Sequence, residues 1–303
     1  MDLRQLRYFA AVVDAGSFTE AAAVLHIAQS ALSRHVRELE DDVGGQLLDR
    51  HARGVTPTET GQVLLRTARF ILAQIEDTKA ELQALHGEVR GAVRFGVPSS
   101  LSQVLYVPLV NYFLDRYPHV LLTLSEATSH GVLVQLREGT LDLGVVTQPP
   151  PDRHMQYEPL MEENLVLMGP VGDPLMRRRS LDPDVLQRVP IIIAAGVLRI
   201  LGSQATGFKP RVLVDSTIPI KSLVLAGRGY AVAPASSNLV DTHEGRIVSV
   251  PIKGLHLQRV IATHRGRPVS RATQAMIAYL RQEASAILKT KPRNASPAPS
   301  GKA

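Results

Sequence analysis

The sequence predicts an α + α/β fold in which a small helical domain and one long helix precede a larger α/β domain. Apolar residues recur at helical spacing through most of residues 1–86. Residues 91–288 instead contain nine short segments rich in Val, Ile and Leu, which alternate with helical stretches. Such alternation favours mainly parallel sheets covered by helices. A chain of 303 residues is long enough for two or three domains of this kind.

The first elements expected are two short helices joined in sequence to a third. Apolar spacing predicts a helix over residues 3–14. Ser17, with Glu20 three residues later, has the capping-box pattern and indicates the start of a short alanine-rich helix. A turn of three residues, 26–28, then leads into another amphipathic helix. Two helices joined by so tight a turn are typical of the helix-turn-helix motif.

The helix after this turn has one apolar and one polar face. Leu32, Val36 and Leu39 form the apolar stripe. The other side has hydroxyl, amide and guanidinium groups, which can bind base edges and phosphates. The residues expected to face DNA on this helix are Gln29, Ser30, Ser33, Arg34 and Arg37. The alternative is an ordinary amphipathic helix with a solvent-exposed polar face.

A wing and a long helix are expected next. Residues 46–58 indicate a two-stranded wing, with Arg50 and Arg53 near its tip. Thr58 is expected to cap a helix that runs to about residue 86. Its apolar positions, with Thr78 filling one gap, repeat in alternating steps of four and three residues, which is a heptad seam. The seam consists of Leu64, Ala68, Ile71, Ile75, Leu82 and Leu85. We interpret it as a dimer contact, and the alternative is a helix that packs on its own domain.

Hydroxyl residues follow three consecutive strands of the predicted α/β domain. The helices between its strands are expected at residues 101–116, 129–138, 216–226 and 270–288. Ser99 and Ser100 follow the first strand, Thr128 the second and Thr147 the third. Strand ends and helix N-termini meet at one edge of such a sheet and favour anions. These four residues therefore predict a pocket for a small molecule, and the geometry favours an anion. For each hydroxyl taken singly, a helix cap or turn bond is the alternative.

Several function classes find no support in the sequence. It has no Cys, which excludes disulfides and thiolate metal sites, and its ten His residues show no ligand spacing. Nucleophile-elbow, P-loop, dinucleotide and zinc-protease motifs are all missing. We therefore expect no catalytic residues, no metal, no cofactor and no enzymatic activity. The N-terminus does not have the pattern of a signal peptide and no run is long enough to cross a membrane, so we expect a cytoplasmic protein.

The net charge of +6 is unevenly distributed. Residues 1–90 contain 10 basic and 13 acidic residues, a net charge of −3, whereas residues 91–288 contain 20 and 15, a net charge of +5. The predicted DNA-binding segment is thus acidic overall, so the case for DNA binding depends on where its cations lie. Residues 289–303 have no apolar pattern and are expected to be a disordered tail.

These segments together resemble the LysR-type transcriptional regulators over essentially the whole chain except the tail. The resemblance is carried by LRQLRYFAAVVDAGSFTEAAAVLHIAQSALSRHVRELE, GGQLLDRHARGVTPTETG, FGVPSS, DRYPHV, LREGTLDLGVV and LAGRGYAVAP. Within the family, HIAQSALS and LLDRHARGVTPT are most similar to the nitrogen assimilation control branch. The connection at residues 195–210 is shorter than in most members, which puts its ligand contacts in doubt.

The resemblance implies a division of the chain into parts. Residues 1–58 would form a winged helix-turn-helix and 59–90 a linker and dimerisation helix. Residues 91–288 would form a two-lobed effector domain similar to periplasmic solute-binding proteins. Its lobe I would comprise about 91–161 and 266–288, and its lobe II about 162–265.

The resemblance also implies the function. Residues 29–40 would enter the major groove, where Gln29, Ser30, Ser33 and Arg34 approach bases and Arg37 reaches phosphate. On the wing, Arg50 and Arg53 would meet backbone or minor groove, with an intradomain ion pair to Asp49 or a neighbour as the alternative for Arg50. The implied partners are double-stranded promoter DNA, a small-molecule effector, RNA polymerase if the protein activates, and further copies in a homodimer or homotetramer. The alternative function is a solute-binding or enzymatic α/β protein with an accessory helical domain.

Overall fold

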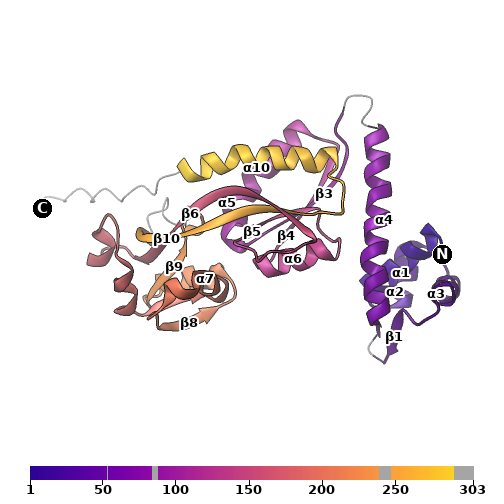
Figure 1. The fold of residues 1–303 in the computed structure, drawn as a ribbon, viewed down its shortest axis with the longest axis horizontal. Coiled ribbons are helices and arrows are strands. Elements are labelled where there is room, and N and C mark those ends of the chain that lie inside the picture. The colour runs from indigo at the N-terminus through magenta and orange to yellow at the C-terminus, as the bar shows by residue number, and fades with distance from the viewer. Residues whose placement is uncertain (53, 84–87, 239–246, 290–303) are drawn as a thin grey trace, which may run out of the picture.

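The computed structural model describes residues 1–52, 54–83, 88–238 and 247–289. A helical N-terminal domain packs along one end of a long helix, and a larger α/β domain lies on the other side of that helix (Figure 1). The predicted α + α/β class is therefore confirmed. None of the described helices is long and apolar enough to cross a membrane.

The N-terminal domain consists of α1 (Leu3–Ala15), α2 (Phe18–Leu25), α3 (Gln29–Val43) and the wing strands β1 (Leu48–His51) and β2 (Gly54–Pro57). Ser17 caps α2 by accepting from the Glu20 amide at 3.4 Å, as predicted. A full capping box that the sequence reading missed starts α1, where Asp2 and Gln5 each accept from the other's amide. Gly16, with φ 63°, ends α1 and its carbonyl accepts from Val55 of the wing. The turns and the wing thus support each other.

An acidic side chain at the distal end of α3 holds the wing. Glu40 Oε1 accepts from the backbone amides of Leu47 at 2.9 Å and Leu48 at 3.3 Å. Leu48 begins β1 and Leu47 directly precedes it, and both are buried in the domain core. One of the carboxylates that make this domain net acidic therefore has a structural role.

The long helix α4 (Glu59–Gln83) differs from the predicted dimer seam in its first half. Thr58 caps it by accepting from the Gly61 amide at 3.0 Å. Ala68 is fully buried among the side chains of its own domain, and Leu64 and Ile71 pack against the same core. Because this side of α4 packs on α1, Ala68 cannot contact a second copy of the chain. Ile75 is half-buried and Leu82 is 59% exposed, while Leu85 lies outside the described residues.

The described part of the α/β domain contains one eight-stranded sheet, in the order β4-β3-β5-β10-β6-β9-β7-β8. The strands are β3 (Gly91–Val97), β4 (Val120–Glu126), β5 (Leu143–Thr147), β6 (Met155–Pro170), β7 (Ile191–Ala194), β8 (Pro210–Val214), β9 (Tyr230–Pro234) and β10 (Ile247–His264). Parallel pairs at each end, β4-β3-β5 and β9-β7-β8, form two lobes. The long strands β6 and β10 run antiparallel between them. The sequence predicted two separate strands where β10 is continuous.

The continuous strand β10 moves the lobe boundary. Residues 259–263 pair with β5 and therefore belong to the sheet of lobe I, although the sequence assigned them to lobe II. A long strand that leaves one lobe and enters the other has no turn signal to mark the crossing. The long strands β6 and β10 consequently belong to both lobes.

Helices cover both faces of lobe I. The helices of the domain are α5 (Ser99–Arg116), α6 (Ser129–Arg137), α7 (Ala195–Leu201), α8 (Thr217–Leu225) and α10 (Arg271–Lys289). In lobe I, α5 and α10 share one core with β3 and β5, whereas α6 packs on the other side (Figure 1). The short connection of lobe II forms α7 and a 3-10 turn at residues 202–205. Lys289 still belongs to α10, and the rest of the predicted tail lies outside the described residues.

Candidate DNA-binding face and effector cleft

The first two turns of α3 present polar side chains to solvent. Gln29, Ser30 and Arg34 are exposed, and the Arg34 side chain is 68% exposed. Its Nε lies 3.7 Å from Glu38 Oε1, a long surface pair that contributes little stability. Arg37, one turn further along, is exposed as well. These four side chains form one accessible face, which we call the reading face.

Ser33 does not belong to the reading face, in contrast to its predicted role. It is only 5% exposed, and its Oγ accepts from Arg37 Nη2 at 3.2 Å. Ser33 lies between Gln29 and Arg37 on the helix, so its burial comes from the packing of α3 on α1 and α2 and from its bond to Arg37. Ser33 therefore supports the orientation of Arg37 rather than facing DNA.

The wing residue Arg50 packs against the start of α2. Its guanidinium carbon lies 4.7 Å from the centroid of the Phe18 ring, a cation–π contact. Arg50 therefore stacks on Phe18, and the described residues contain no ion pair between Arg50 and Asp49. The exposed guanidinium of Arg50 lines an open hollow of about 580 Å³ between α3 and the wing, together with Arg37. Arg53 lies outside the described residues.

Two of the four predicted effector residues do converge, but on a side chain that the sequence reading missed. Arg259 of β10 donates from Nη2 to Ser100 Oγ at 3.0 Å and from Nη1 to Thr147 Oγ1. Ser100 lies in the first turn of α5 and Thr147 ends β5, so both strand ends meet there as predicted. All three side chains are buried.

A buried carboxylate completes this cluster and connects it to lobe II. Glu163 of β6 accepts from Arg259 Nε at 3.0 Å, and the exposed fractions of the two side chains are 3% and 2%. The other carboxylate oxygen of Glu163 accepts from the backbone amide of Ser236, which follows β9. Ser236 Oγ in turn donates to the Ser100 carbonyl at 3.4 Å. The cluster of Ser100, Thr147, Glu163, Ser236 and Arg259, the hinge cluster, therefore contacts both lobes and both long strands.

The other two predicted effector residues lie nearer the surface. Thr128 is exposed and caps α6 by accepting from the Gly131 amide at 3.1 Å. Ser99 is half-buried at the first position of α5. The neighbouring Ser129, at the first position of α6, makes neither a cap nor a turn bond, because its Oγ accepts from the distant Thr147 amide at 3.1 Å. The strand-end hydroxyls thus divide into two that bind Arg259 and two at the surface.

A sequence signal for the buried pair existed. Met161, Glu163 and Leu165 are alternate residues of one strand, and all three are buried. On β10, Leu257 and Arg259 have the same relation. In a strand, every second residue faces inward. A charged residue at such a position indicates either that the strand is wrongly predicted or that the residue belongs to a buried functional pair. What the sequence did not contain was the pairing of these two strands.

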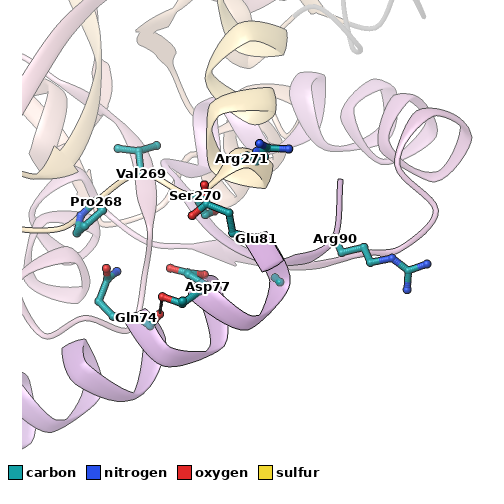
Figure 2. Close-up of a pocket in the computed structure, with 10 residues that line it drawn as sticks. Gln74, Asp77, Glu81, Arg90, Pro268, Val269, Ser270 and Arg271 are labelled. Atoms are coloured by element: carbon teal, nitrogen blue, oxygen red, sulfur yellow. Dashed lines mark hydrogen bonds between the residues drawn. The ribbon is translucent and has the colours of Figure 1, made fainter. Parts of the chain in front are cut away.

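The long helix α4 lies against lobe I near its distal end. Asp77 and Glu81 of α4 face the segment before α10, including Ser270, across a small cavity of about 60 Å³ (Figure 2). Beneath it, Asp142 accepts from Arg94 Nη2 at 2.7 Å, and Arg267 Nη2 lies 3.2 Å from the same carboxylate. Burial, followed by the nearby Asp142 carboxylate, raises the pKa of Asp77 above its ordinary value.

Replacement of this half-buried carboxylate gives a first prediction. The ionised form of Asp77 is disfavoured in the folded state, so stability is present below its unfolded pKa and falls as pH rises through its folded pKa. We expect Asp77→Asn to raise Tm by about 1–3 °C at pH 7.5 and to lose this advantage towards pH 4. Thermal unfolding against pH measures it, with the exposed Asp115→Asn as the control. A lower Tm at pH 7.5 would mean that Arg267 stabilises the Asp77 carboxylate.

The fold and these two sites define a transcriptional regulator that joins a winged helix-turn-helix to a two-lobed ligand-binding domain. Residues 3–62 match the family described as "Bacterial regulatory helix-turn-helix protein, lysR family". Residues 86–285 match the "LysR substrate binding domain". The chain therefore belongs to the LysR family of transcriptional regulators. The described residues contain no group of three or more potential metal ligands.

Characterised relatives resemble this chain over most of its length. The nitrogen assimilation regulatory protein Nac of Klebsiella aerogenes is 32% identical over 78% of this chain and 79% of its own length. The regulator CbbR of Rhodospirillum rubrum is 30% identical over 93% and 96%. A cysteine variant of full-length OxyR from Pseudomonas aeruginosa has the same fold, with TM-score 0.75, 24% identity and coverage of 94% and 97%. CbnR solved with its target DNA gives TM-score 0.66, 21% identity and coverage of 94% and 100%.

Proposed function

We propose that the protein regulates transcription by sequence-specific binding to promoter DNA and that a small molecule in the inter-lobe cleft modulates this binding. The observation that supports DNA binding most directly is the reading face, in which an amide, a hydroxyl and two guanidinium groups are exposed on one side of α3. These groups suit base edges and phosphates. As a DNA-binding regulator it would act in the cytoplasm, with RNA polymerase as a further partner if it activates.

The part of the DNA that each side chain would contact follows from its position along α3. Gln29, Ser30 and Arg34 lie in the first two turns and would meet base edges, since an Arg or Gln side chain can form a bidentate pair with guanine or adenine. Arg37, Arg50 and the wing would meet the DNA backbone or the minor groove. The acidic residues at the distal end of α3 begin at Glu38, beside Arg34, and would limit nonspecific attraction.

A mobility-shift assay on the DNA upstream of the protein's own gene tests this function. We expect retention at nanomolar protein in the presence of excess unrelated DNA, as specific binding is commonly 10³-fold or more tighter than nonspecific binding. Equal retention of both DNAs, or none, would contradict the proposal and favour a solute-binding or enzymatic protein.

The cleft is the proposed effector site because the carboxyl ends of β3, β4 and β5 meet there. Thr128 and Ser99 lie at its surface, above the hydroxyls that bind Arg259. A thermal-shift screen of metabolites, followed by mobility shifts with each stabilising compound, tests the site. A compound that stabilises the protein and changes operator affinity would support it.

The distal half of α4 is the proposed dimer contact. Ile75 and Leu82 are the described seam residues that are not needed to close the N-terminal core. Two copies joined there would place two reading faces on two half-sites.

We expect the double substitution Ile75→Glu and Leu82→Glu to convert the dimer into a monomer, because buried carboxylates in an apolar seam are costly. Light scattering after gel filtration measures the mass. Operator affinity should fall as well, since one half-site contact is lost. Val171→Glu, at an exposed apolar residue of lobe II, is the matched control. An unchanged mass of the double variant would place the dimer contact elsewhere.

A further inference from the structure

At the proposed effector site, two carboxylates of the chain itself lie where an anionic ligand was expected. Glu163 accepts from Arg259 Nε at 3.0 Å and from the Ser236 amide. Glu126, at the carboxyl end of β4, accepts from Ser102 Oγ at 2.6 Å in the first turn of α5. Both of the features that attract anions, a guanidinium and a helix N-terminus, thus have an internal partner.

The charge of the Arg259 guanidinium is already balanced inside the chain, and three of its five N–H groups already have acceptors. Each of its three nitrogens donates to an acceptor of the chain, and its charge is balanced by Glu163 at 3% exposure. A ligand anion brought to this point would be buried beside a carboxylate. The cost of desolvating a second negative charge there would not be repaid by a new ion pair.

A lysine of lobe II contacts lobe I. Lys221 of α8 donates from Nζ to Gln103 Oε1 of α5 at 2.7 Å, a contact between the two lobes. Together with Arg259 it balances Glu126 and Glu163, so these four charged groups sum to zero. Ser100 and Thr147 accept from Arg259, and each hydroxyl keeps its own proton to donate to an oxygen of a ligand.

We propose that the cleft selects an effector without net charge, rich in hydrogen-bond acceptors, and that Glu163 excludes anions by acting as a built-in counter-ion for Arg259. A neutral polyol or a zwitterion has this chemistry. The proposal rests on the effector site proposed above and replaces the anionic effector that the strand-end hydroxyls suggested. It makes Glu163 a residue that determines ligand specificity.

Inorganic phosphate at 1–10 mM is a probe that requires no knowledge of the effector. We expect wild-type Tm to change by less than about 1 °C, because Arg259 is already paired. Glu163→Gln keeps the side-chain shape but leaves the buried guanidinium without a counter-ion. Its Tm should be lower in chloride and should rise by about 3 °C or more with phosphate at the same ionic strength.

The matched control removes both charges. The Glu163→Gln, Arg259→Gln variant should fold and give no phosphate response. Should Glu163→Gln be unfolded in chloride, the proposal requires that phosphate restore its folding. No response of Glu163→Gln to phosphate, or folding in neither buffer, would overturn it. A wild-type response that is lost in the double variant would overturn it too, because the anion would then displace Glu163.

A further arm separates this inference from the proposed function. Metabolite pairs that differ only as acid and amide are tested for their effect on operator binding of the wild type. An acid that acts while its amide does not, with loss of the effect in Ser100→Ala, would overturn the charge selection and leave effector control intact. If no compound changes operator binding, effector control fails, whatever the phosphate result.

Discussion

Replacement of Arg259 by Met should lower the free energy of unfolding by about 3–5 kcal/mol, with a fall in Tm of about 10 °C. The substitution keeps most of the side-chain volume but leaves the Glu163 carboxylate buried with only the Ser236 amide as a partner. The hydroxyls of Ser100 and Thr147 lose a donor at the same time. Urea unfolding and thermal unfolding measure both quantities, with attention to the transition of the α/β domain.

The chain contains a matched control for this prediction. Arg281 of α10 donates to Glu158 of β6 at 2.6 and 2.8 Å, but both side chains are exposed to solvent. Arg281→Met should cost less than about 1 kcal/mol, because surface ion pairs are worth little. The double variant Arg259→Met, Glu163→Met should recover much of the loss, since an apolar pair can replace a buried ion pair. Equal losses for the two single variants would show that burial of the Arg259 pair is not what makes it important.

Arg34→Ala should weaken operator binding by about 10- to 100-fold, because a bidentate base contact is worth about 1–3 kcal/mol. The Arg34 side chain is 68% exposed and makes only a long pair with Glu38, so Tm should change by less than about 1 °C. The base preference at one position of each half-site should also relax. Titration of the operator and of single-base operator variants in mobility shifts measures both effects.

Two further variants distinguish base reading from charge loss. Arg37→Ala should weaken binding to all sequences alike and reduce the slope of affinity against salt by about 0.9. Arg178→Ala removes an exposed arginine from lobe II and should leave operator affinity unchanged. If Arg34→Ala leaves affinity and base preference as they are, α3 is not presented to bases in the way we propose.

Local patterns were sufficient for most of the helices and short strands. The helices predicted at 129–138, 216–226 and 270–288 form within about one or two residues of those limits. Ser17 and Thr58 cap the helices that they were expected to cap. Such features depend on residues three or four positions apart, so the amino-acid order contains them directly.

Features that depend on distant residues were not predicted. The heptad spacing of Leu64, Ala68 and Ile71 is the same for a dimer seam and for a helix packed on its own domain. Only the position of α1 showed that Ala68 is enclosed within the chain. Likewise, the polar character of Ser33 suggested a contact with DNA, whereas the packing of α3 on its neighbouring helices buries it.

The sequence by itself determined the order of the domains, the helix-turn-helix with its polar face and the presence of hydroxyls at strand ends. Tertiary structure alone decided what meets those hydroxyls. Arg259 and Glu163 are 96 residues apart, and each is on a strand whose alternation marks it only as inward-facing. Their pairing depends on the register in which β6 and β10 cross between the lobes, and register is set by the packing of the whole sheet. The charge balance of the effector cleft is for this reason a property of the folded chain.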